Sequence, residues 1–298
     1  MVLRRAYLQR CVAMLAMPLA LPVRLLAEGQ TPGETAARTR HLRYAVTAQN
    51  QSASALERAS VLVHAPVQQT STQRVEALRT TRPAVVESDA FGNQTLRVDL
   101  EAMAPYSTTV VSIDVDLLIF EEPKAETLAP LVRQSFTSPE HNIESTHPRI
   151  QALAATLRTD DPVRTARNAF DWMRRHLRAY EYRIQVRGAL ATLEQGGGSC
   201  VDYACLHAAL MRASAIPARA LGGYIAGENA VPRAYDYHYW AEFMANGAWR
   251  LADAHQGRFT REPGRYVAMR IITSAAPSRL GENGRFRTLE PNLLVTMN

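Results

Sequence analysis

Lysine and cysteine are scarce in this chain of 298 residues. Lys124 is the only lysine, although lysine and arginine together number 34, so the chain has almost no side-chain amine for crosslinking to itself. Three cysteines are too few for the disulfide framework of a small secreted domain. Cys200 and Cys205 lie five residues apart on a predicted helix, where their side chains diverge by about 140° and cannot form a disulfide. We therefore expect free thiols, with Cys205 packed in the core and Cys200 available for chemistry.

Motifs for metals and phosphates are missing as well. The histidines are scattered and the two nearby cysteines lie five residues apart, so no set of spacings would hold zinc in tetrahedral geometry. Gly196-Gly197-Gly198 lacks the lysine and Ser/Thr that follow the glycines of a Walker motif. We therefore expect no cofactor.

The positive charge of the chain is concentrated at its start. The formal net charge is +6, but four arginines precede residue 28 with no acidic residue among them, which leaves +2 for the rest. Nucleic-acid binding requires clustered basic faces, so we expect no nucleic-acid partner.

Residues 1–27 have the features of an export signal. Arginines precede an apolar run, 11–23, that is broken by two prolines and is too short to span a bilayer, which takes roughly 20 apolar residues. Arg4-Arg5-Ala6-Tyr7-Leu8 resembles a twin-arginine signal. The sequence predicts a periplasmic or secreted protein without a membrane span once the signal is removed. The alternative is a frayed cytoplasmic N-terminus.

The rest of the chain changes from period-two to helical patterning, which predicts an α+β fold. Residues 28–37 are a predicted linker, 38–121 a β-sandwich-like N-terminal domain, 122–139 a second linker and 140–298 a catalytic domain. The clearest alternating segments are His41–Val46, Ser60–Val63, Thr95–Leu100 and Val111–Leu117. Helices are predicted over about 150–157 and after Asp160 or Asp161, where Pro162 stands in the first turn. Near the C-terminus, 265–272 and 293–295 are predicted to add strands.

A glycine-led cysteine provides the candidate nucleophile. Gly196-Gly197-Gly198 permits a tight turn, Ser199 is a good N-cap, and Cys200 begins a helix that runs to about Ser214. A thiol at a helix N-terminus feels the macrodipole and the unpaired amide protons, which favour the thiolate. The same amides can contact a developing oxyanion.

A hairpin is predicted to bring the other candidate groups together. Asn246-Gly247 is a strong two-residue turn, and pairing Ala245 with Ala248 places Trp240 opposite Asp253. His238, Trp240 and Asp253 then share one sheet face, with His238 and Asp253 diagonal at about 7–8 Å. His255 falls opposite His238, as a rival base or a residue that lines the cleft.

The stretch from about Asp161 to Asp253 resembles the transglutaminase-like superfamily of papain-fold thiol enzymes. The matching segments are Gly198–Ala204, Leu210–Arg219, Gly222–Tyr224, His238–Glu242 and Trp249–Asp253. The resemblance implies that Cys200 is the nucleophile, His238 the general base and Asp253 its orienting acid. It also implies an α+β fold in which the cysteine helix packs on an antiparallel sheet. Two features depart from the family pattern: Tyr239 replaces a residue that is commonly small, and Ala254-His255 follows the acid where proline is frequent.

The hypothesis that follows is an exported thiol enzyme acting on amide bonds through a thioester. Water as acceptor would give peptide hydrolysis or deamidation, and an amine would give transamidation. The expected partner is a protein or peptide substrate, including cell-envelope material. Gln195 is a candidate oxyanion donor, and Trp240 and His255 are candidate cleft residues. The alternative is a noncatalytic envelope protein that binds peptide or polysaccharide in the same cleft.

Overall fold

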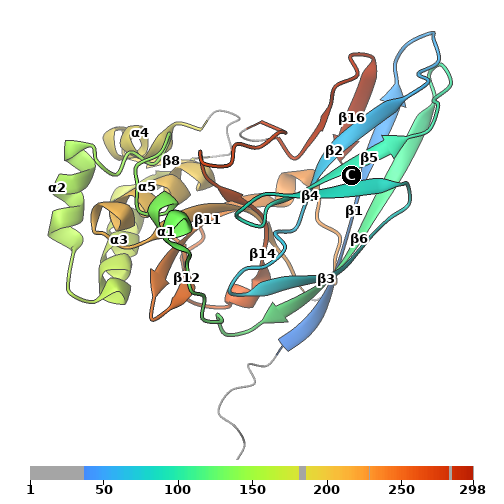
Figure 1. Ribbon diagram of the computed structural model, residues 1–298. Coiled ribbons are helices and arrows are strands. Elements are labelled where there is room, and N and C mark those ends of the chain that lie inside the picture. The colour runs from blue at the N-terminus through green and yellow to red at the C-terminus, as the bar shows by residue number, and fades with distance from the viewer. Residues whose placement is uncertain (1–36, 181–185, 228, 282–283, 298) are drawn as a thin grey trace, which may run out of the picture. The chain divides into compact units, whose positions relative to one another are not determined.

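The computed structural model describes residues 37–180, 186–227, 229–281 and 284–297 (Figure 1). The predicted export signal, 1–27, lies outside the described residues, as does 28–36 of the first predicted linker. No helix in the described ranges is long and apolar enough to cross a membrane.

Two antiparallel sheets build the first half of the described chain, as the alternating pattern predicts (Figure 1). The first contains β1 (Ala37–Asn50), β6 (Thr108–Phe120) and β3 (Gln73–Thr80); the second contains β2 (Ala59–Ala65), β5 (Gln94–Leu100) and β4 (Ala84–Ser88). Buried and exposed residues alternate strictly along much of β1, β5 and β6. The inward side chains of both sheets, such as Tyr44 and Val98, share one apolar core, so this region is a β-sandwich.

The last strands of the chain return to this sandwich. β15 (Phe286–Thr288) pairs with β2, and β16 (Leu293–Met297) pairs with β1. The short strand β10 (Asn229–Ala230) also pairs with β1. The limits predicted from the sequence, 38–121 and 140–298, therefore do not match the sheets, because strand patterning marks a strand without showing which sheet edge it will join.

Within the described residues, five helices follow the sandwich strands and come before the next large sheet of the chain. They are α1 (Pro130–Ser135), α2 (Pro148–Leu157), α3 (Pro162–His176), α4 (Gly188–Gln195) and α5 (Cys200–Ala213). α1 lies within the stretch predicted as a linker, 122–139. Asp161 caps α3, since its carboxylate accepts a hydrogen bond from Val163 N at 2.8 Å. All residues of α5 from Cys200 to Arg212 are buried, and α2, α3 and α4 pack around it (Figure 1). α5 is therefore a central helix rather than a surface one.

The sheet beneath α5 has the order β13 (Arg258–Phe259), β12 (Ala248–Asp253), β11 (Tyr237–Ala245), β9 (Ala218–Ile225) and β14 (Tyr266–Ile272). A two-stranded ladder joins β7 (Arg178–Ala179) to β8 (Gly197–Gly198), and short 3₁₀ turns cover Ala234–Asp236 and Pro263–Arg265. Ala245 pairs with Ala248, as predicted. Asn246 and Gly247 both have positive φ, which the predicted two-residue turn requires.

A buried ion pair joins the central strands of this sheet. Arg219 on β9 and Glu242 on β11 are cross-strand partners, and both guanidinium contacts reach Glu242 Oε2, at 2.7 and 2.9 Å. The two side chains are 3% and 8% exposed. The guanidinium also lies 4.0 Å from the ring centroid of Trp249. The pair is thus desolvated and fully engaged, so losing one partner would leave a buried charge.

The sandwich also fixes the edge strand β14. The side-chain amide of the fully buried Gln73 donates to Ala268 O at 2.9 Å, and its carbonyl accepts from Ala268 N at 2.8 Å. Ala268 precedes a register shift between β14 and β9. The sandwich residue Gln73 therefore completes the backbone pairing of β14, the strand that begins at Tyr266.

Candidate functional site

The turn before α5 brings the chain unusually close to itself. Gly196 ends α4 with φ +65°. A Cβ on Gly197 would lie 2.4 Å from the carbonyl oxygen of Arg178, and one on Gly198 would lie 2.5 Å from Cβ of Asp202. Glycine is therefore required at both positions to place Ser199 and then Cys200 at the start of the helix.

Asp202 stabilises this turn through hydrogen bonds and an ion pair. Its carboxylate, 1% exposed, accepts hydrogen bonds from Ser199 N at 2.9 Å and from Ser199 Oγ at 3.0 Å. It also accepts from Arg187 N at 2.9 Å and forms an ion pair with the Arg187 guanidinium at 3.2 Å. The contacts with Ser199 form a capping box, and the Arg187 contacts bind the segment before α4 to the same carboxylate. From sequence Asp202 was only part of a matching segment; its structural role is to orient the first turn that carries Cys200.

Cys200, His238 and Asp253 meet at the N-terminal end of α5. The Cys200 thiol hydrogen-bonds the His238 imidazole, and His238 Nε2 lies 2.7 Å from Asp253 Oδ2. Since Nε2 is engaged by Asp253, Nδ1 is the ring nitrogen left for the sulfur. Cys200 and His238 are each 8% exposed and Asp253 is 2% exposed. The structure thus joins the three predicted residues in one hydrogen-bonded row.

The contacts of His238 with Cys200 and Asp253 favour the protonated form of its imidazole ring. Burial alone would lower the pKa of His238, but the hydrogen bonds to Asp253 and Cys200, with their charges, outweigh it and raise the pKa to about 9. The arrangement therefore places an imidazolium beside the Cys200 sulfur, and a cationic neighbour of this kind activates cysteine nucleophiles.

Asp253 has two further partners that sequence reasoning missed or left without a role. Tyr266 donates its hydroxyl to Oδ2 at 2.8 Å, and Gln256 donates its backbone N–H to Oδ1 at 3.0 Å. These contacts keep the carboxylate aimed at His238. The segment 265–272 carries a strand pattern, but its place in the sheet depends on packing against β9, so the sequence held no signal for the Tyr266 contact.

Two predicted accessory residues lie elsewhere. Trp240 is 1% exposed and packs against Tyr266, with ring centroids 5.0 Å apart, so it supports the site from the core instead of lining a cleft. Gln195 is exposed at the end of α4, where its side-chain oxygen accepts from the Arg187 guanidinium. The turn at Gly196 separates Gln195 from the nucleophile, so this geometry does not make it an oxyanion donor. A better-placed group is the Cys200 backbone N–H, which lies in the first helical turn, where amides lack intrahelical acceptors.

The segment that carries these three residues is similar to a known protein family. The family model described as "Transglutaminase-like superfamily" matches residues 151–254. These residues run from α2 to the residue after Asp253 and so contain the whole Cys200–His238–Asp253 row. This segment belongs to the transglutaminase-like superfamily.

Solved structures similar to this chain include two bacterial proteins, the first of which shares its fold. A proposed cysteine protease from Cytophaga hutchinsonii is 19% identical, with a TM-score of 0.54, over 88% of this chain and 92% of that one. The periplasmic domain of TgpA from Pseudomonas aeruginosa is 17% identical, with a TM-score of 0.41, over 76% and 86%. A search of curated proteins gave no match. The family and the fold support a thiol enzyme in the general sense.

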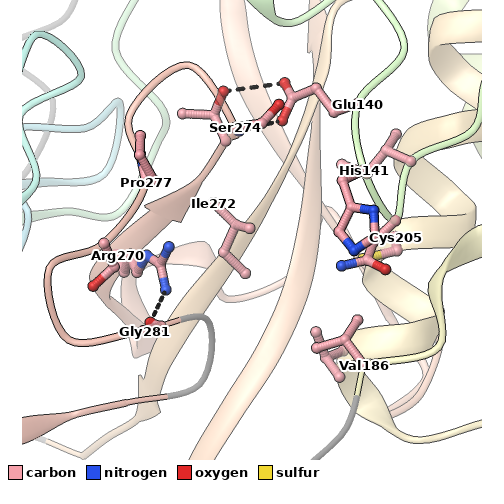
Figure 2. A pocket seen from close by; sticks show the side chains of 14 residues that line it. Glu140, His141, Val186, Cys205, Arg270, Ile272, Ser274, Pro277 and Gly281 are labelled. Carbon is pink, nitrogen blue, oxygen red and sulfur yellow. Dashed lines mark hydrogen bonds between the residues drawn. The ribbon is translucent and has the colours of Figure 1, made fainter.

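A cavity of about 260 Å³ adjoins α5, the helix that Cys200 begins (Figure 2). Val201 and Cys205 of α5 form one wall, and Ile272 with the loop after β14 forms another. The carboxylate of Glu140, at the rim of the cavity, accepts hydrogen bonds from the Arg212 guanidinium at 3.0 Å and from Ser274 N at 2.7 Å. Burial raises the pKa of the Cys205 thiol, so Cys205 stays protonated. This sulfur therefore offers a natural internal comparison for Cys200.

Asp253→Asn should lower the pKa of His238 from about 9 toward the ordinary value of 6.5, because it removes the negative charge that favours the imidazolium. NMR titration of the ring nitrogens measures this directly. In the wild-type chain the pKa of His238 is higher in the folded state than in the unfolded state. The stability that the protonated ring contributes is therefore complete below pH 6.5 and is lost as the pH rises from 6.5 to 9. Asp171→Asn, in an exposed pair with Arg167, is the control. A ring pKa still near 9 in Asp253→Asn would contradict this account.

Proposed function

We propose that the chain is an enzyme that cleaves amide bonds through a thioester on Cys200. The observation that carries the proposal is the hydrogen-bonded row from the Cys200 sulfur through His238 to Asp253. Three groups of this kind, brought together from a helix N-terminus and two strands, make up the nucleophile, base and orienting acid of thiol enzymes.

In the first half of the reaction the Cys200 thiolate attacks the amide carbonyl carbon, and the oxygen becomes anionic. The backbone N–H of Cys200 supports this oxyanion. The C–N bond then breaks, and His238 gives its Nδ1 proton to the departing ammonia or amine. Asp253 holds the imidazole in the required tautomer throughout.

In the second half an acceptor attacks the thioester. Its proton passes to the now neutral His238, the C–S bond breaks, and the thiolate–imidazolium pair is restored. Water gives hydrolysis or deamidation, and an amine gives transamidation. With Lys124 as the only lysine, an amine acceptor would come from another molecule.

We place this enzyme outside the cytoplasm, as a periplasmic or secreted protein acting on proteins, peptides or cell-envelope material. The support is the arginine-led apolar run before residue 28. Sequencing the N-terminus of protein recovered from the periplasm or medium tests the location; an intact Met1 on cytosolic protein would contradict it.

Alkylation by iodoacetamide tests the catalytic proposal. At pH 6 we expect Cys200 to react at least roughly tenfold faster than free cysteine, because His238 supplies the positive charge that stabilises its thiolate. Peptide mapping by mass separates Cys200 from Cys205, which we expect to react slowly because it is 2% exposed and its pKa is raised.

The His238→Ala variant is the control for this experiment. Its Cys200 should lose the enhancement and react with iodoacetamide at pH 6 no faster than free cysteine. If wild-type Cys200 already behaves in that way, a noncatalytic protein that binds peptide or polysaccharide in the same cleft becomes the better description.

A further inference from the structure

His255 lies beside the catalytic row without belonging to it. Its ring centroid is 5.9 Å from that of His238, with the rings tilted by 48°. It also meets Tyr203 edge to face, with centroids 5.3 Å apart. Tyr203 is three residues after Cys200 on α5. His255 therefore contacts both the base and the first turn of the nucleophile's helix.

The ring nitrogens of His255 are shielded from solvent. Within the described part of the chain, neither Nδ1 nor Nε2 has a hydrogen-bond partner of normal geometry. Two buried histidines, by contrast, each keep one: His207 Nε2 lies 3.3 Å from Ala166 O, and His64 Nε2 lies 3.3 Å from Ser278 Oγ. A shielded polar group without a partner is destabilising. Such an imidazole next to reacting groups is suited to bind a polar molecule that arrives during the reaction.

The two neighbouring imidazoles carry different charges. Burial, followed by the positive charge of His238, lowers the pKa of His255, whereas His238 is held protonated up to about pH 9. A neutral imidazole has one donor and one acceptor nitrogen. The nearby backbone of Tyr180 favours a proton on the nitrogen that faces it. The other nitrogen is then an acceptor for an O–H or N–H group.

We propose that His255 binds the acyl acceptor, water or a small primary amine, for attack on the Cys200 thioester. The inference rests on the proposed function and assigns His255 to its second half. One hydrogen of the acceptor bonds the free nitrogen of His255 and orients the attacking lone pair. The other hydrogen passes to neutral His238 as the new C–O or C–N bond forms and the C–S bond breaks. His255 keeps its charge throughout.

The test separates the two half-reactions with p-nitrophenyl acetate. Release of p-nitrophenol reports acylation, and intact-mass measurement follows the decay of acetyl-Cys200. In His255→Phe, which keeps a ring of similar shape without nitrogens, we expect acylation within about twofold of wild type and deacylation slowed by roughly 10- to 100-fold. His255→Gln restores a hydrogen-bond acceptor and should recover much of the loss. His176→Phe on the surface of α3 is the control and should leave both phases unchanged.

Each outcome has a definite meaning. Slow deacylation in His255→Phe with recovery in His255→Gln supports the inference. Equal slowing of both phases, or deacylation at the wild-type rate, overturns it while leaving the thioester mechanism intact. If the wild-type protein forms no acetyl-Cys200, the proposed function fails and the role of His255 fails with it. Circular dichroism of each variant establishes that it folds.

Discussion

Cys200→Ala should abolish turnover of any amide substrate, with kcat reduced by about 10⁴-fold or more. Removing the nucleophile of a catalytic triad leaves only the stabilisation given by binding and by the oxyanion contacts. The measurement is steady-state release of ammonia or amine, together with a search for the acyl-enzyme by intact mass. The folded state should persist, because alanine is smaller than cysteine and is readily accepted in a helix.

Cys205→Ala is the matched control for this prediction. Cys205 lies on the same helix and is also buried, but it faces the apolar core and the cavity wall. We expect its loss to reduce stability modestly and to leave kcat near the wild-type value. Activity that survives in Cys200→Ala and disappears in Cys205→Ala would reverse the assignment of the nucleophile.

Glu242→Ala should cause the largest loss of stability, about 3–5 kcal/mol in the free energy of unfolding. The carboxylate receives both contacts from Arg219, and the guanidinium is pressed against Trp249 where water cannot replace the lost partner. Urea denaturation measures the effect. The expected mechanism is an uncompensated buried charge between β9 and β11, the strand that carries His238.

Two further variants isolate that mechanism. Glu194→Ala removes one partner of an exposed pair with Arg149 and should cost at most about 1 kcal/mol. Replacing Arg219 and Glu242 together by methionine should recover much of the stability that Glu242→Ala loses, because no buried charge remains. If Glu242→Ala is no more harmful than Glu194→Ala, the buried pair is not a source of stability.

Local patterns predicted that Cys200, His238 and Asp253 lie close together. The turn at Asn246-Gly247 fixed the pairing of Ala245 with Ala248, and this register brought Asp253 within 2.7 Å of His238. Such pairing depends on a few adjacent residues, since a slip of one position would turn the acid to the opposite face. The glycines before Cys200 are equally local, because their requirement arises from close backbone approach.

Accessory contacts were harder to predict. Gln195 is near Cys200 in sequence, yet the left-handed turn at Gly196 leaves its side chain with Arg187 at the surface. Trp240 shares the predicted face with His238 but is covered by Tyr266. Trp240 is thus covered by a residue from a later strand, whereas the contacts that turn Gln195 away come from the adjacent Gly196 and from Arg187, eight residues earlier.

Sequence patterns alone place Cys200 at a helix start, His238 and Asp253 on one hairpin, and strands in the first half of the chain. Long-range packing establishes that Tyr266 hydrogen-bonds Asp253, that Gln73 pairs with β14, and that the C-terminal strands join the sandwich. The two groups of features differ in the distance along the chain over which their interactions act. Turns, caps and hairpin registers arise from interactions over a few residues, whereas the partners of a sheet edge or a buried carboxylate are chosen when the whole core packs.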